Sequence, residues 1–334
     1  MVEIFGTLGP SCQETELLEK MFREGMTGMR LNMSHSGLKK SGEIIRNYHQ
    51  AACRAGVKEE LLIDMQGPEI RIGLLEEPLM LREMEEVRLA DQNAAVSGSA
   101  VIPVPEQVLS ILEAGDHILL DDGRIELVIM ELSRKVTAEV IRGGILRSRK
   151  SLKIVDKYIA GPAITEQDRE NIRLAEEYGV TALMQPFVTR GEELLEVREE
   201  LRRNHMEHIR VFAKIENREG MKNIRDIMPH ADMIVIARGD LGNDMPLWEL
   251  PAAQMELSEI CREAGKPFLV VTQMLASMTE NPLPTRAEVS DIFHAVCDGA
   301  GAVMVTNETA VGKYPVEVIR YLKKTAEEAV KWRG

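Results

Sequence analysis

The sequence predicts an α/β fold: a (β/α)8 TIM barrel with a small all-β domain inserted after the third strand. Short apolar runs alternate with amphipathic segments that end near glycine. The connections between them are short, which favours a closed barrel over an open doubly wound sheet. One connection is different, because roughly ninety residues separate the third strand from the next helix, far more than a loop holds.

Strands of a parallel barrel are buried on both faces, so each should be a short and nearly continuous apolar run rich in β-branched residues. Runs of this kind recur along the whole chain. The predicted strands are residues 4–8, 28–33, 60–65, 181–187, 209–215, 233–238, 267–273 and 302–306.

Helices are expected between these strands, where apolar residues recur at helical spacing. The clearest are residues 166–179, 249–265 and 317–330. Thr165 followed three residues later by Asp168 has the pattern of a helix start. The alternation of strand and helix is therefore complete enough to predict the barrel.

The insertion is predicted at residues 74–158, between barrel segments 1–73 and 159–334. Its sequence alternates apolar and polar residues around Asp-Asp-Gly and Gly-Gly turns, which is typical of antiparallel strands. It leaves the barrel at the carboxyl end of a strand, the face where barrel active sites are built. We therefore predict a β-barrel-like domain that serves as a lid.

Composition excludes several classes of protein. The 334 residues carry a net charge of -13, which argues against affinity based on nucleic-acid phosphates. The four cysteines form no C-x-x-C pair, so neither a zinc site nor a disulfide framework is indicated. No basic segment precedes an apolar one at the start, and no run is long enough to span a membrane. A soluble, cytoplasmic protein is expected.

Charged residues follow two neighbouring predicted strands. Lys214 and Glu216 are two residues apart at the end of the fifth strand, so both side chains should point to the same side. Asp240 follows the sixth strand in the segment Ala-Arg-Gly-Asp-Leu-Gly. Two carboxylates with open positions between them suit Mg²⁺ or Mn²⁺, which also binds substrate oxygens.

Further groups that bind anions follow other strands. Gly239 and Gly242 allow close backbone approach, and a helix that begins there offers free N–H groups. Arg30 lies in the second predicted strand and Arg71 comes after the third, and arginine binds phosphate through two parallel hydrogen bonds. A metal, a lysine and two arginines in one pocket indicate phosphoryl transfer or stabilisation of an enolate.

Each feature also has a simpler interpretation. A Lys-x-Glu pair is often a structural ion pair, and Arg-Gly-Asp-Leu-Gly can be only a turn. His35 fits a polar loop residue better than a general base, and Cys12 fits an ordinary thiol. The functional interpretation is favoured because several strands end in charged or glycine-rich segments, and the seventh ends at the polar residues Thr272 and Gln273.

In order and in spacing, the chain resembles the pyruvate kinase family over nearly its whole length. The matching segments are TLGPSC (7–12), GMTGMRLNMSHSG (25–37), DMQGPEIRIG (64–73), DDG (121–123), KIENREG (214–220), ARGDLG (237–242), TQMLASM (272–278), PTRAEVSD (284–291) and ETAVGKYP (308–315).

The resemblance implies roles for the reacting groups. Lys214 matches the lysine that contacts the transferring phosphoryl group and the enolate oxygen, and Arg30 matches the arginine that grips the phosphoryl group. Glu216 and Asp240 match the ligands of the divalent metal. The substrate carboxylate is held in the family by the residues that match Gly239, Asp240 and Thr272.

Roles on the nucleotide side and at a monovalent cation are implied in the same way. His35 and Arg71 match positions near the nucleotide. Glu69 matches a residue of potassium-requiring members. The K⁺ ligands are matched by Asn32, Ser34, Asp64 and the backbone carbonyl of Met65.

The implied reaction transfers the phosphoryl group of phosphoenolpyruvate to ADP, with Mg²⁺ (or Mn²⁺) and K⁺, as a glycolytic step that gives pyruvate and ATP. Four positions depart from the family pattern. Gln66 replaces a lysine of the family, and Ala160 replaces an active-site aspartate. Pro186 and Asn307 replace residues that are small in the family. We expect the family's C-terminal regulatory domain to be absent, because the sequence ends at residue 334. We therefore expect no effector regulation, and a homodimer through barrel faces or a monomer.

Two other functions are compatible with this sequence. One is a metal-dependent enzyme that acts on phosphoenolpyruvate, pyruvate or another 2-oxo acid with altered or lost nucleotide use, which Gln66 and Ala160 favour. The other is a non-catalytic protein that senses such a ligand. The retention of Lys214, Glu216 and Asp240 together argues against the last.

Overall fold

The structure is a computed structural model that describes residues 2–34, 37–67, 70–93, 101–121, 123–132, 136–155, 157 and 162–333. The chain forms two compact units. The barrel unit comprises Met1–Gly67 and Pro162–Gly334, and the inserted unit comprises Pro68–Gly161. The predicted insertion, 74–158, lies inside the second unit, and its role as a lid stays a prediction.

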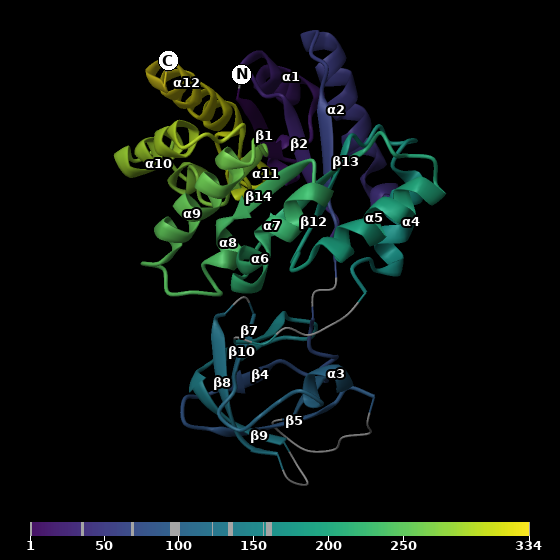
Figure 1. The fold of residues 1–334 in the computed structure, drawn as a ribbon, viewed down its shortest axis with the longest axis vertical. Helices are drawn as coiled ribbons and strands as arrows, with labels where there is room; N and C mark the ends of the chain where they lie inside the picture. The colour runs from purple at the N-terminus through teal and green to yellow at the C-terminus, as the bar shows by residue number, and fades with distance from the viewer. Residues whose placement is uncertain are drawn as a thin grey trace. The chain divides into compact units, whose positions relative to one another are not determined.

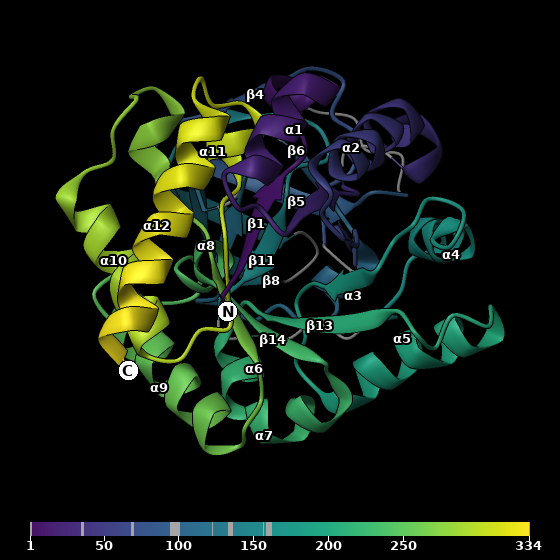
Figure 2. The same cartoon turned by 90° about the horizontal axis from the view of Figure 1, so that it is seen from above.

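Eight parallel strands of the barrel unit close into a barrel, in the order β1-β16-β15-β14-β13-β12-β3-β2. This confirms the predicted fold class. Figure 2 shows the helices placed around these strands. The strands are β1 (Glu3–Thr7), β2 (Gly28–Asn32), β3 (Glu60–Asp64), β12 (Ala182–Gln185), β13 (Arg210–Ile215), β14 (Met233–Ala237), β15 (Phe268–Val271) and β16 (Ala302–Met304).

The helices of the barrel unit follow the strands along the chain (Figure 1). They are α1 (Thr15–Arg23), α2 (Gly42–Ala55), α4 (Glu166–Leu174), α5 (Gly191–Arg203), α6 (Arg218–Lys222), α7 (Ile224–Ile227), α8 (Arg238–Leu241), α9 (Leu250–Glu263), α10 (Arg286–Cys297), α11 (Asn307–Ala310) and α12 (Pro315–Arg333). Short 3-10 turns lie at Pro10–Cys12, Leu38–Ser41, Met228–His230 and Ala276–Thr279. Within the described ranges, no helix is both long and apolar enough to cross a membrane.

Three predicted strands were two residues too long at their carboxyl ends, among them 302–306, which ends at Met304. The strand predicted at 181–187 ends at Gln185, because Pro186 has no N–H to donate and Phe187 has a φ of 55°. The strand predicted at 267–273 ends at Val271, because Thr272 and Gln273 have φ values of 84° and 55°. Such values lie outside the β region. Similarly, the helix predicted at 166–179 ends at Leu174.

Two apolar layers hold the barrel unit together. The inside of the barrel is filled by one cluster of side chains, among them Phe5, Leu62, Phe212, Leu269 and Met304, all fully buried. A larger cluster lies between the outer faces of the strands and the helices. The barrel is therefore a packed core, and reactive side chains belong at its ends.

The inserted unit has a core of its own, built from aliphatic side chains of its sheets. A six-stranded sheet has the order β11-β7-β8-β9-β5-β6, and a two-stranded sheet pairs β10 with β4. A one-turn helix, α3 (Glu106–Leu109), accompanies them. The strands are β4 (Leu79–Leu81), β5 (Glu86–Asp91), β6 (Val101–Val104), β7 (His117–Leu120), β8 (Ile125–Leu132), β9 (Val136–Arg142), β10 (Gly144–Leu146) and β11 (Leu152–Ile154).

Candidate active site

Two cations and two carboxylates meet at the ends of the barrel strands. The Arg30 guanidinium donates through Nε to Asp64 Oδ2 at 2.8 Å, and its Nη2 lies 2.6 Å from the same oxygen. Lys214 Nζ lies 3.2 Å from Asp64 Oδ1 and 2.8 Å from Glu216 Oε1. We call Arg30, Asp64, Lys214 and Glu216 the charge cluster.

Neighbouring strands bring the charge cluster together. Arg30 lies on β2, and Asp64 ends the adjacent strand β3. Lys214 lies on β13, which is separated from β3 by β12 alone. Side chains of alternate barrel strands share a layer of the interior, so Lys214 reaches Asp64 past β12. Glu216 follows β13 directly, and its contact with Lys214 agrees with the alternation of side chains along a strand.

Burial makes the charges of this cluster interdependent. The Lys214 side chain is 12% exposed and that of Glu216 is fully buried. Burial alone lowers the pKa of Lys214, but Asp64 and Glu216 outweigh it, so the pKa of Lys214 lies above that of an ordinary lysine. Lys214 therefore keeps its positive charge at neutral pH.

The pKa values of Asp64 and Glu216 are shifted in opposite directions. Burial raises the pKa of Asp64, but Lys214 and Arg30 more than offset it, and the pKa lies below its usual value. Burial also raises the pKa of Glu216, and with the negative charge of Asp240 it reaches about 7 despite Lys214. Glu216 is therefore the acid of this cluster whose charged form most needs a further positive charge nearby.

The surroundings of Glu216 fit a divalent metal. Oε2 accepts a hydrogen bond from the Phe187 N–H at 2.7 Å, and the buried Oε1 lies 2.8 Å from Lys214 Nζ, its ion-pair partner. Asp240 lies on α8, directly after β14, and its charge acts on Glu216. In the part of the chain that the structure describes, no three His, Cys, Asp or Glu gather as a metal site. The two acids suit a Mg²⁺ or Mn²⁺ ion completed by water and substrate.

The segment after β15 lies against the turn that carries Asp240. A Cβ added at Gly239 would lie 3.0 Å from Thr272 Cγ2, so a side chain there would crowd Thr272. Arg238 donates to the Thr272 carbonyl through Nη2 at 2.6 Å and to both Asp291 carboxylate oxygens at 2.8 and 2.7 Å. Arg238 thus links the Thr272 carbonyl to Asp291, a contact that the sequence alone did not indicate although Arg238 lies in a quoted motif.

The predicted K⁺ ligands lie at the ends of β2 and β3. Asn32 and Asp64 are register partners, and Asn32 Oδ1 accepts from the Ser34 N–H at 3.0 Å. Asp64 Oδ1 is buried and accepts no hydrogen bond from the described residues, although Lys214 is near. Met65 follows Asp64 and donates its N–H to the Met184 carbonyl. These oxygens are the hard ligands that a K⁺ site requires.

The predicted nucleotide contacts are only partly described. His35 and Ala160 lie outside the described residues, as does Glu69, which matches a residue of potassium-requiring members. Arg71 belongs to the inserted unit, where its Nη1 donates to the Arg149 carbonyl at 2.8 Å. The binding of a nucleotide therefore stays a prediction.

We expect the buried cysteines to resist thiol reagents. Burial raises the pKa of the Cys12 thiol to about 11 and that of Cys261 to about 12, so neither forms much thiolate at about pH 8. Cys53 is exposed. Titration with Ellman's reagent should modify Cys53 rapidly and Cys297 slowly, and should reach Cys12 and Cys261 only after unfolding. Rapid reaction of Cys12 in the native protein would contradict this assignment.

Comparison with known proteins identifies the family. A family model described as "Pyruvate kinase, barrel domain" matches residues 1–319. A pyruvate kinase of Geobacillus stearothermophilus is 37% identical over 99% of this chain and 58% of its own length. One of Bacillus licheniformis is 36% identical over 98% of this chain and 57% of its own. This chain thus spans little more than half the length of these relatives. On the match to the barrel domain, the chain belongs to the pyruvate kinase family.

Proposed function

We propose that this chain transfers the phosphoryl group of phosphoenolpyruvate to ADP, which gives pyruvate and ATP. The buried charge cluster supports the proposal best, because Arg30 and Lys214 present two positive charges at one point of the barrel end. As a step of glycolysis, the reaction would take place in the cytoplasm. The four unpaired cysteines agree with a reducing compartment.

In this proposal Arg30 and Lys214 act on the phosphoryl group and on the enolate oxygen. Negative charge moves from the transferring group to the leaving enolate during the reaction. A fixed cation in a site shielded from water stabilises that charge without reorganising. Because Asp64 and Glu216 hold Lys214 Nζ within 3.2 Å of each carboxylate, its position is set before the substrate arrives.

Glu216 and Asp240 would hold the divalent metal. When bound, Mg²⁺ or Mn²⁺ supplies a Lewis acid that polarises substrate oxygens and neutralises developing charge. The proximity of the two acids costs free energy in the absence of a cation, since the Asp240 charge raises the pKa of Glu216. The burial of Glu216 beside the Asp240 charge is therefore better explained by metal binding than by stability alone.

Thr272 and the backbone of Gly239 and Asp240 would hold the carboxylate of the substrate. These groups lie together, because Gly239 leaves room for Thr272. Asn32, Ser34, Asp64 and the Met65 carbonyl would bind K⁺ beside Arg30. Arg71 and His35 would contact the nucleotide. After phosphoryl transfer, the enolate that Lys214 stabilises is protonated at carbon.

A second function is favoured by Gln66. A neutral amide occupies the position of a lysine in the family, so one positive charge near the phosphates is missing. This substitution favours an enzyme that forms the enolate of pyruvate or another 2-oxo acid with altered or lost nucleotide use.

One assay distinguishes the two functions. Pyruvate formation from phosphoenolpyruvate and ADP is measured with Mg²⁺ and K⁺ and with each omitted in turn. Turnover that requires both ions supports the kinase. No turnover, together with metal-dependent exchange of the methyl protons of pyruvate, supports the second function. Absence of both reactions contradicts both.

We also propose a homodimer through a barrel face. Three large apolar side chains are exposed just before α9 and on it: Leu247 at 70%, Trp248 at 82% and Met255 at 62%. Large aromatic side chains dominate the energy of protein interfaces, so Trp248→Glu should weaken the dimer at least ~30-fold. Sedimentation equilibrium measures the change. The exposed Trp332→Glu is the control, and a parent protein that is monomeric at high concentration contradicts the proposal.

A further inference from the structure

The Asp168 carboxylate joins two segments of the barrel unit that are distant in sequence. It is fully buried at the start of α4 and accepts hydrogen bonds at both oxygens. Oδ1 accepts from the Gln66 N–H at 2.8 Å, and Oδ2 accepts from the Gly67 N–H at 3.0 Å. Oδ2 also accepts from the N–H and the hydroxyl of Thr165, at 3.1 and 2.7 Å.

Capping of α4 accounts for only part of this arrangement. A capping box needs contacts between the N-cap residue and the third helical residue, here Thr165 and Asp168. The bonds to Gln66 and Gly67 add two donors from a segment about one hundred residues earlier. A buried carboxylate with four donors binds its partners firmly, because each hydrogen bond is charge-assisted.

The segment that Asp168 holds follows directly on Asp64 and Met65. On its other side, Gly67 has a φ of 62°, and a Cβ at this position would lie 2.3 Å from Pro186 Cγ. The backbone after β3 is therefore confined between α4 and the end of β12. A change at Asp168 should be transmitted to the two residues before Gln66.

α4 also holds the segment after β2. Asn171, one turn after Asp168 and fully buried, accepts through Oδ1 from the Leu38 N–H at 3.2 Å. Thus one helix face contacts the segments that follow both strands with proposed K⁺ ligands. Asp168 accepts hydrogen bonds from the segment after β3, and Asn171 accepts one from the segment after β2.

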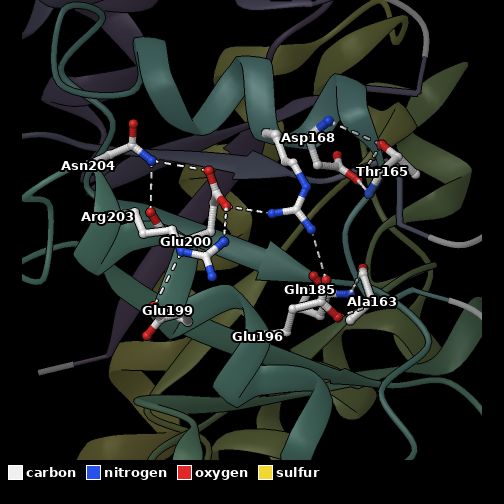
Figure 3. Close-up of polar contacts among 10 residues, drawn as sticks. Ala163, Thr165, Asp168, Gln185, Glu196, Glu199, Glu200, Arg203 and Asn204 are labelled. Carbon is white, nitrogen blue, oxygen red and sulfur yellow. Dashed lines mark hydrogen bonds and ion pairs between the residues drawn. The ribbon is translucent and has the colours of Figure 1, made fainter.

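The start of α4 is itself anchored. The Gln185 amide donates to the Ala163 carbonyl at 2.7 Å, and the Ala163 N–H donates to Glu196 at 3.1 Å (Figure 3). Arg169 pairs with Glu196 at 3.0 Å and with Glu200. These contacts fix α4 to β12 and α5, so Asp168 acts from a rigid support.

We propose that Asp168 is a positioning residue that sets the geometry of the Asp64 and Met65 oxygens for a monovalent cation. This inference rests on the proposed function, which assigns K⁺ to these oxygens. The carboxylate acts through the backbone of Gln66 and Gly67 and does not touch the cation. Its loss should weaken K⁺ binding more than it lowers the rate at saturating K⁺.

The experiment compares Asp168→Asn with Glu193→Gln. The asparagine places an amide donor where an oxygen accepted N–H groups. Glu193 is a matched control, because it is the third residue of α5 and accepts from Thr189 and Arg190, at its own helix start. Hydrogen exchange of Gln66 and Gly67 is measured first and needs no turnover. The K⁺ concentration for half-maximal pyruvate formation is measured second.

In Asp168→Asn we expect the two amides to exchange at least ~10-fold faster, because their acceptor is lost. The half-saturating K⁺ concentration should rise ~10-fold or more, as for other groups that support metal ligands. Glu193→Gln should change neither. If Asp168→Asn does not fold, Asp168→Glu keeps the charge and the cap and should still raise the K⁺ requirement.

Other outcomes separate this inference from the proposed function. If the parent turns over but the variant has an unchanged K⁺ requirement, the inference is wrong and the function stands. If exchange accelerates without a change in K⁺ requirement, Asp168 holds the Gln66 and Gly67 N–H groups but does not position cation ligands, which also overturns the inference. If the parent shows no turnover, both the proposed function and the role of Asp168 in K⁺ binding are contradicted, whatever the exchange result.

Discussion

Lys214→Met should lower the turnover of phosphoenolpyruvate and ADP at least ~10²-fold, the cost of removing one preorganised group that stabilises developing charge. Methionine keeps the length of the side chain and removes its charge. Lys214 is the cation that lies between Asp64 and Glu216, so no other described side chain of the charge cluster can replace it at that point. Pyruvate formation at saturating substrate measures the loss.

This variant needs a test of folding, because it leaves buried carboxylates without their partner. Breaking a buried ion pair costs about 3 to 5 kcal/mol of unfolding free energy. Turnover is therefore compared at a temperature where circular dichroism shows the variant to be folded. Lys222→Met is the control, since Lys222 is 72% exposed on α6. Activity of folded Lys214→Met close to that of the parent would remove Lys214 from the proposed mechanism.

Glu216→Gln should weaken Mn²⁺ binding at least ~10²-fold. Mutation of groups that merely support a metal ligand costs 10 to roughly 100-fold in affinity, so loss of a direct ligand should cost at least the upper value. The amide preserves the shape of a fully buried side chain but removes the charge that Lys214 and the metal would share. Electron paramagnetic resonance of free Mn²⁺ measures the affinity without turnover.

The matched control for Glu216→Gln is Glu219→Gln. Glu219 lies three residues later on α6 and is 46% exposed, so its amide should leave Mn²⁺ affinity unchanged. Equal affinities of the parent and of Glu216→Gln would show that the metal is held elsewhere, and would refute the assignment of Glu216.

The strands of the barrel could be predicted from short-range pattern, because each buried parallel strand must be a nearly continuous apolar run. The residues at which these strands end could not be predicted in this way. Thr272 and Gln273 were expected to continue a strand, yet both have positive φ. At this point the Arg238 guanidinium donates to the Thr272 carbonyl and pairs with Asp291 on α10. No local pattern records a contact between such distant segments.

Within the site, sequence alone determined that Lys214 and Glu216 would lie together, because alternate residues of a strand point to one side. The motifs of the sequence also indicated Asp240 as a metal ligand and Arg30 as an anion-binding residue of the same site. Only the closed barrel decided that Lys214 would meet Asp64, 150 residues away, and that Asp168 would hold Gly67, 101 residues away. The physical reason is that the periodicity of a chain determines which side of each element is apolar or charged. Which distant elements face one another is determined by how those apolar sides pack.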